Sequence, residues 1–128
     1  MSIEIAEYDV FFILPHLEEK VMQQIKQMAE EGLGFKINIS PQFLEFHYSG
    51  RDTGRRIVNF LCSIAPLIGT AEAEAECHIT TDTDDSYFEF YSIQDGRLYK
   101  QEAKIVRMPP VEVCLEKPET NRQTVSVG

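Results

Sequence analysis

The stretch at residues 49–57, SGRDTGRRI, combines the residue types that hold anions. Backbone N–H groups at a helix start attract negative charge, and arginine side chains bind phosphate or carboxylate groups. The spacing differs from a Walker loop and no lysine is present, so a nucleotide site is not predicted. An alternative is a glycine turn with a helix cap at Asp52 or Thr53 and arginines on a solvated face. The candidate anion site consists of Gly50, Arg51, Thr53, Gly54, Arg55 and Arg56.

A second candidate site is a run of carboxylates with no lysine or arginine among them. The run consists of Glu72, Glu74, Glu76, Asp82, Asp84, Asp85, Glu89 and Asp95. Its aspartate-rich turn lacks the spacing and the glycine of an EF-hand, and we predict no metal site there or beside His78. The charges fit a solvated strand face paired with Lys100 and Lys104, or a surface that docks a basic protein partner.

Aromatic side chains alternate along two of the predicted strands. Phe43 and His47 share one side of a strand, and Tyr87 and Tyr91 share one side of another. RNA-binding domains stack bases on such aromatics, but the glutamates expected on the same face would repel a phosphate backbone. The opposite orientation, with these tyrosines buried, stays open because the hairpin strands are apolar on both sides. The predicted partner surface comprises Glu72, Glu74, Glu76, His78, Tyr87, Glu89 and Tyr91.

The histidines and cysteines form no catalytic or metal-binding motif. The three histidines show neither an HExxH pattern nor a triad order. Cys62, Cys77 and Cys114 are too widely spaced for a zinc knuckle or a disulfide framework. We expect Cys62 and Cys77 to be small core residues of a protein in a reducing compartment. No cofactor is predicted, and binding is a better expectation than catalysis.

Composition limits the classes of partner. The chain has 128 residues, 43% of them hydrophobic, and a formal net charge of −9. This charge argues against nucleic acid and against an anionic membrane surface as partners. Acidic residues precede the first apolar run, which is not typical of a secretory signal, and we expect a cytoplasmic protein. We predict one domain at residues 1–116 and a disordered tail at residues 117–128.

Hydrophobic periodicity predicts the first half of the fold. An unbroken apolar run at 10–14 predicts a strand over 5–14 that is covered on both faces. A helix is expected to start near Pro15, with a buried stripe of Leu17, Val21, Ile25 and Met28. Strands are predicted over 35–40 and 43–49. A second helix begins near Asp52 or Thr53 and ends or kinks before Pro66.

Strict alternation predicts the strands of the second half. Over 71–80 the alanines, Cys77 and Ile79 point to one side and the glutamates to the other. Asp95-Gly96 between β-rich runs predicts a hairpin within 86–107. Residues 111–116 are expected to add an edge strand.

The element order predicts an α+β fold. We expect a ferredoxin-like βαββαβ sandwich, extended by a C-terminal β-hairpin, with a mostly antiparallel sheet and two helices on one face. The leading functional hypothesis is a protein-interaction or regulatory module, in its specific form an inhibitor or immunity-type protein for a basic partner. The alternative is a sensor or weak enzyme that holds a phosphate- or carboxylate-bearing ligand at the arginine-rich helix start. A homodimer through the sheet is also predicted.

Overall fold

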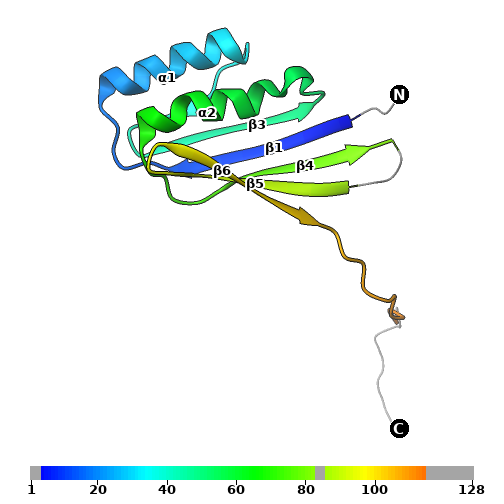
Figure 1. The fold of residues 1–128 in the computed structure, drawn as a ribbon. Coiled ribbons are helices and arrows are strands. Elements are labelled where there is room, and N and C mark those ends of the chain that lie inside the picture. The colour runs from blue at the N-terminus through cyan, green and yellow to red at the C-terminus, as the bar shows by residue number, and fades with distance from the viewer. Residues whose placement is uncertain (1–3, 83–85, 115–128) are drawn as a thin grey trace.

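Two helices lie on one face of a six-stranded antiparallel sheet (Figure 1). The computed structural model describes residues 4–82 and 86–114. The strand order is β2-β3-β1-β4-β5-β6, and the α+β class is therefore confirmed. The sheet differs from a simple βαββαβ arrangement because β5 and β6 continue it beyond β4. The elements are β1 (Glu4–Ile13), α1 (Glu19–Gly32), β2 (Asn38–Ile39), β3 (Phe43–Gly50), the 3-10 helix η1 (Thr53–Arg55), α2 (Arg56–Ile68), β4 (Ala75–Thr81), β5 (Ser86–Gln94) and β6 (Arg97–Lys104).

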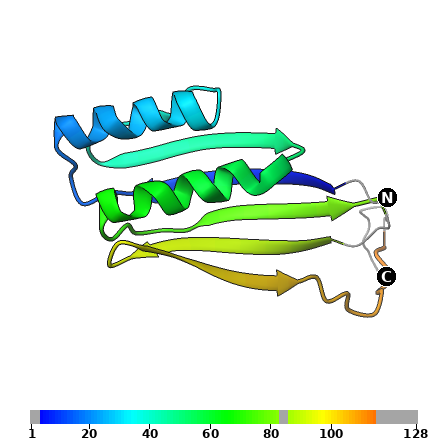
Figure 2. The ribbon, with the colours of Figure 1, turned by 45° about the horizontal axis from the view of Figure 1, so that its top comes forward.

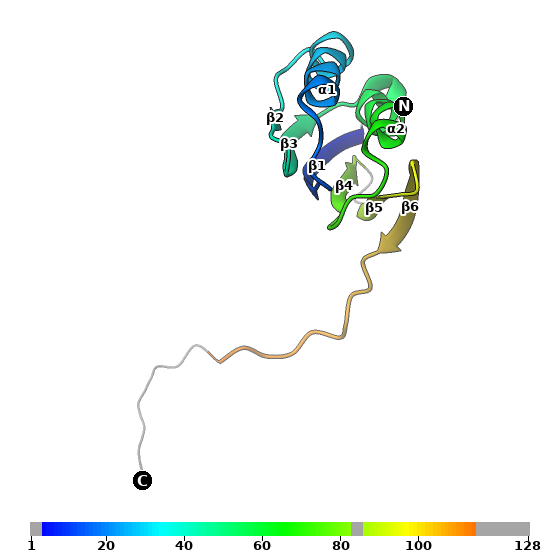
Figure 3. The same cartoon turned by 90° about the vertical axis from the view of Figure 1, so that its left-hand side faces the viewer.

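Both helices lie over the same face of the sheet, as the turned views in Figures 2 and 3 show. The buried hydrophobic core lies between the helices and this face. Tyr8, Val10 and Phe12 of β1 point into this core and are buried. Phe11 and Ile13 alternate with them on the other face, where each is 43% exposed. The prediction that the first strand is covered on both faces is therefore wrong. We call the face that carries Phe11 and Ile13 the open face.

The first helix begins later than the sequence predicted. His16 has a φ of 75°, so the chain turns after β1 and α1 starts only at Glu19. All four residues of the predicted stripe contribute to the core: Leu17 is buried just before α1, Ile25 is buried within it, and Val21 and Met28 are partly buried against the core. Met22 and Ala29 are buried in α1 as well.

The second helix runs through its proline. The chain of α2 continues to Ile68, beyond the predicted end before Pro66. A proline in the last turn removes a single intrahelical hydrogen bond, which explains why the helix tolerates it there. Cys62 of α2 is exposed, so its predicted burial is wrong, whereas Cys77 is buried as expected.

Two predicted strands are shorter in the structure. Only Asn38–Ile39 of the predicted strand at 35–40 forms β2. The strand predicted from Ala71 begins at Ala75, because Ala73 takes a φ of 71° and its side chain is exposed. Within β4 the alternation is confirmed, with Cys77 buried and Glu76 exposed.

The C-terminal hairpin is confirmed at the predicted turn. Asp95 and Gly96 have φ values of 53° and 75°, the left-handed pair that a two-residue hairpin turn requires. The chain leaves the sheet after Lys104, and residues 111–114 form no strand. Residues 115–116 and the tail predicted at 117–128 lie outside the described residues.

Candidate functional site

The open face is hollowed and acidic. A hollow of about 550 Å³ lies over β3, β1 and the start of β4. Phe11 lines it together with four carboxylates: Asp9, Glu45, Glu74 and Glu76. These side chains come together because they occupy alternate positions on antiparallel neighbours, with Asp9 opposite Glu76 and Phe11 opposite Glu45. The hollow can therefore accept a cationic group beside an aromatic ring.

Few cations neutralise the hollow. Lys36 and His47 also line it. The Nε2 atom of His47 lies 3.5 Å from Glu7 and 3.8 Å from Asp9, with the histidine side chain 55% exposed. The four carboxylates outnumber these two side chains, so the lining of the hollow carries a net negative charge. Of the predicted partner residues, Glu74 and Glu76 line the hollow, and Glu72 lies nearby in a bridge to Ile13.

Aromatic rings lie on the open face on both sides of the carboxylates. Phe11 stacks on Phe43, with ring centroids 6.3 Å apart. His78 stacks on Phe88 at 4.5 Å, and Phe88 stacks on Phe90 at 6.1 Å. The Nε2 atom of His78 also lies 2.5 Å from the hydroxyl of Ser86. The prediction of aromatics on this face holds for Phe43, whereas on β5 it is the phenylalanines that occupy it.

Three predicted partner residues lie on the other face. Tyr87, Glu89 and Tyr91 share the side of β5 that faces the helices, and Glu89 and Tyr91 are buried. Their predicted place on the acidic face is therefore wrong. The strand carries aromatics at every position from 87 to 91 except Glu89, so alternation alone does not distinguish its two sides. The tyrosine hydroxyl groups explain which side of β5 faces the helices, because a tyrosine can hydrogen-bond to a buried charge and a phenylalanine cannot.

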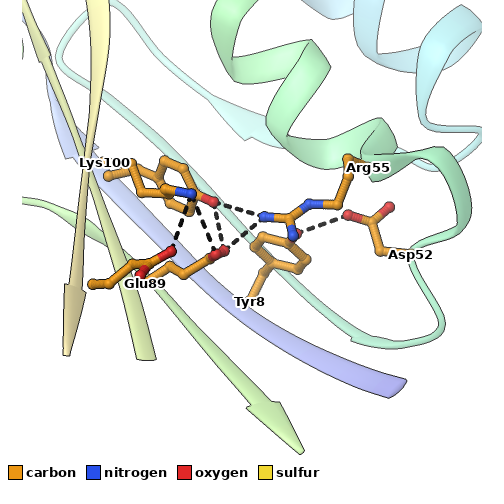
Figure 4. Close-up of polar contacts among 7 residues, drawn as sticks. Tyr8, Asp52, Arg55, Glu89 and Lys100 are labelled. Atoms are coloured by element: carbon orange, nitrogen blue, oxygen red, sulfur yellow. Dashed lines mark hydrogen bonds and ion pairs between the residues drawn. The ribbon is translucent and has the colours of Figure 1, made fainter. Parts of the chain in front are cut away.

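Glu89 is the centre of a polar cluster beneath the start of α2 (Figure 4). Its side chain is 3% exposed, and its Oε1 atom accepts hydrogen bonds from Arg55 and Tyr91, each at 2.6 Å. The same Arg55 Nη2 atom donates to the Tyr91 hydroxyl at 2.9 Å. Lys100 of β6 lies 3.7 Å from the second carboxylate oxygen. The buried charge is thus satisfied by two cations and a phenol.

A second buried contact joins the same turn to β1. The Tyr8 hydroxyl donates a 2.7 Å hydrogen bond to Oδ2 of Asp52, whose side chain is 3% exposed. The other carboxylate oxygen has no hydrogen-bond partner among the described residues and lies 4.0 Å from Nε of Arg56. The side chain of Asp52 makes no hydrogen bond to the helix start, so the predicted cap by Asp52 is wrong.

Burial keeps the tyrosine hydroxyl groups and the cysteine thiol of the core protonated. Burial raises the pKa of Tyr8, and its hydrogen bond to Asp52 raises it further. The pKa of Tyr91 is raised by burial and by its hydrogen bond to Glu89. Burial also raises the pKa of Cys77 to about 11, although a hydrogen bond with Tyr8 opposes the shift. At neutral pH these groups are protonated, and none of them is an activated nucleophile.

The predicted anion-binding arginines do not converge on one pocket. The guanidinium of Arg55 turns inward to Glu89. The guanidinium of Arg56 donates to the carbonyl of Leu33 at 3.3 Å and lies 5.9 Å from the Tyr48 ring centroid. Arg51 is exposed, and its carbonyl accepts a hydrogen bond from Tyr48. The expected convergence is therefore wrong, because the buried Glu89 is the carboxylate that Arg55 binds.

The remaining residues of the predicted anion site shape the turn into α2. Gly50 and Gly54 have φ values of 149° and 75°, and Arg55 has 57°. Thr53 begins η1, and its side chain lies outside the described part of the structure. These residues reverse the chain from β3 into α2, as the glycine-turn interpretation predicted.

Neither a metal centre nor a membrane span is present in the described ranges. No three His, Cys, Asp or Glu side chains of residues 4–82 and 86–114 are arranged to hold a metal ion. Asp84 and Asp85 lie outside these ranges. Within them, no helix is both long and apolar enough to cross a membrane.

Comparison of the chain with models of known protein families, with curated proteins and with solved structures finds no match. Sequence reasoning missed the pairing of Arg55 with Glu89 and of Tyr8 with Asp52. The only signal was a lone glutamate between two tyrosines, at Tyr87-x-Glu89-x-Tyr91.

Proposed function

We propose that this protein is an interaction module whose acidic open face binds a basic protein partner. In its specific form the module is an inhibitor or immunity-type protein that neutralises that partner. The single observation that supports this proposal best is the hollow of about 550 Å³ that four carboxylates and the half-exposed ring of Phe11 line together.

An arginine side chain of the partner fits the chemistry of this hollow. A guanidinium stacks on an aromatic face, and here Phe11 supplies the ring. Its donor fork matches carboxylate groups, which Asp9 and Glu76 present on neighbouring strands. Lysine would make weaker and less directional contacts, because its ammonium is a point charge without the planar fork.

The charge of the whole chain favours such a partner. A formal net charge of −9 attracts a basic protein over distances longer than any single contact. Electrostatic attraction of this kind raises the association rate and weakens as salt is added. An inhibitor of a basic partner benefits from fast association.

The test uses a short oligo-arginine peptide and the amide NMR spectrum of the full chain. The peptide should shift amides of β1, β3 and β4, and the shifts should diminish at high salt. Replacing Glu45, Glu74 and Glu76 with lysine should weaken binding by well over tenfold. The matched control replaces the exposed Glu18, Glu30 and Glu31 with lysine, which changes the net charge equally.

Equal weakening by both triple variants would show that only the net charge matters and would refute the proposed site. An oligo-lysine peptide of the same length should bind more weakly than oligo-arginine. Equal binding of the two peptides would remove the assigned role of Phe11.

Three finer aspects accompany this proposal. We propose a ferredoxin-like arrangement for the first four strands, supported by their order β2-β3-β1-β4 and by two helices on one face. We propose a cytoplasmic location, supported by the exposed thiol of Cys62. A non-catalytic role is supported by the protonated state of the buried Cys77 and Tyr8.

A further inference from the structure

The outer edge of β6 offers backbone groups for pairing. β6 is the last strand of the sheet, and in the described part of the chain it pairs only with β5. Gln94 and Arg97 flank the two-residue turn and therefore form a hydrogen-bonded pair. Backbone direction alternates along a strand, so the even-numbered residues from Leu98 to Lys104 direct their N–H and C=O groups outward.

The side chains along this edge are self-complementary in one register. Antiparallel pairing of two β6 edges can place Gln101 opposite its own copy. Lys100 then lies opposite the partner's Glu102, and Glu102 opposite the partner's Lys100. Opposite charges in such cross-strand positions are stabilising, and like charges are destabilising.

The neighbouring registers are electrostatically unfavourable. A shift that centres the pairing on Lys100 places this lysine opposite the partner's Lys100. A shift to Glu102 places two glutamates opposite each other and Lys100 opposite the partner's Lys104. Only the register centred on Gln101 uses the outward backbone groups and pairs every Lys100 with a carboxylate.

Intramolecular contacts already hold the side chains that this register needs. The Lys100 ammonium lies 3.3 Å from Glu102 and 3.7 Å from the buried Glu89. Figure 4 shows Lys100 beside Glu89. Side chains that are ordered before association lose less conformational entropy on binding.

The segment after β6 supplies apolar surface for the same contact. Val106, Met108, Val111 and Val113 are each 75–81% exposed. In the register centred on Gln101, Ile105 lies opposite the partner's Arg97, so the segment runs on past the partner's hairpin turn. Strand pairing alone buries little area, and these exposed apolar side chains are available to pack where the segment passes the partner's hairpin turn.

We propose that two copies of this chain pair through their β6 edges, antiparallel and centred on Gln101, into one sheet that continues across both copies. This dimer differs from a face-to-face dimer because it leaves the acidic open face of each copy free for its partner. It does not depend on the function proposed above.

The first experiment tests the register by disulfide trapping. Gln101→Cys and, as its matched control, Tyr99→Cys are made in full chains whose Cys62 and Cys114 are replaced with serine. The two copies of residue 101 form a non-hydrogen-bonded pair about 4.5 Å apart, which a disulfide can bridge. Residue 99 lies opposite the partner's Ala103, so the two thiols of the Tyr99→Cys control should not meet. We expect Gln101→Cys to give a covalent dimer under mild oxidation and Tyr99→Cys to stay reduced.

The second experiment tests the charges by sedimentation equilibrium. The full chain should shift from 14.7 kDa towards twice that mass as its concentration rises to about 1 mM. Glu102→Lys should weaken association about tenfold, because it opposes Lys100 with a lysine. Glu30→Lys on α1 makes the same charge change away from the edge and should have no such effect.

A 14.7 kDa species throughout the series would overturn the proposal. Equal trapping of the two cysteine variants, or a dimer unaffected by Glu102→Lys, would also overturn it. The trapping result does not require Glu102→Lys to fold, so the two tests are independent.

Discussion

The guanidinium of Arg55 lies 2.6 Å from the carboxylate of Glu89, although 34 residues separate the two in the chain. The contact joins the turn before α2 to β5. Burying a carboxylate without a partner is costly, so this pair constrains how the start of α2 sits over the sheet. Two elements that are distant in sequence are thus fixed by one charge pair.

Replacing Arg55 with alanine should lower the free energy of unfolding by about 2 kcal/mol. The expected loss is smaller than for a fully buried pair because the Arg55 side chain is 40% exposed and Lys100 still faces Glu89. Urea denaturation measures the change. Arg51→Ala at an exposed position is the control and should change stability by no more than about 0.5 kcal/mol.

A double variant distinguishes loss of the pair from general damage to the turn. Glu89→Gln added to Arg55→Ala removes the unpaired charge and should recover part of the lost stability. Without any recovery, the charge of Glu89 would not be the reason for the loss.

Replacing Tyr8 with phenylalanine should cost about 2 kcal/mol of unfolding free energy. The change removes the 2.7 Å hydrogen bond to Asp52 and leaves both oxygens of that buried carboxylate without a hydrogen bond. Thermal and urea denaturation both report the effect. Tyr99→Phe removes a hydroxyl from a side chain that is 47% exposed and should leave stability unchanged. Equal effects of the two substitutions would contradict a structural role for the Tyr8 contact.

Replacing Gly96 with alanine should destabilise the hairpin by about 1 kcal/mol. A Cβ atom at this position would lie 3.6 Å from Pro66, so the cost comes from the φ of 75° and not from a clash. Asp95→Asn keeps a residue that tolerates its φ of 53° and should be nearly neutral. A neutral Gly96→Ala in denaturation experiments would mean that the turn readjusts.

Local patterns in the sequence predicted the elements better than the pairings between them. The alternation in β4 predicted that strand, and the Asp95-Gly96 pair predicted the hairpin turn, because periodicity and turn chemistry are local signals. β5 was ambiguous because it is aromatic on both sides, and burial of Glu89 depends on Arg55, which lies in a different element. Backbone reversals at His16 and Ala73 shortened α1 and β4. Alanine gives no signal of a positive φ, and histidine is enriched there but adopts it in only a few per cent of cases.

In the candidate site, too, the residues that local alternation exposes were predicted, and those that strand pairing brings together were not. Glu74 and Glu76 were predicted as exposed partner residues, and the structure places both beside the hollow. Asp9 and Glu45 were not among them, because their position beside Glu76 follows from the register of β1 with its two neighbours. Strand register across a sheet is a tertiary property, and a single sequence carries little direct information about it.

Stability should fall as the pH rises above about 9, and Cys77 should contribute to the first part of this loss. Folding raises the pKa of the Cys77 thiol from 9.0 to about 11 because the group is buried. The folded state therefore binds more protons than the unfolded state between these values. The stabilisation is complete below pH 9 and is lost as the pH rises to 11, with the raised pKa values of Tyr8 and Tyr91 acting in the same direction above pH 10.

Urea denaturation at a series of pH values from 8 to 11 measures this dependence. Cys77→Ala should be less stable at pH 8 because it creates a small cavity, but its stability should stay flat until the tyrosines of the unfolded chain begin to ionise. The difference in unfolding free energy between the original chain and Cys77→Ala should narrow by roughly 2 kcal/mol between pH 8 and 11. Parallel curves for the original chain and Cys77→Ala would show that the thiol does not contribute to the alkaline loss.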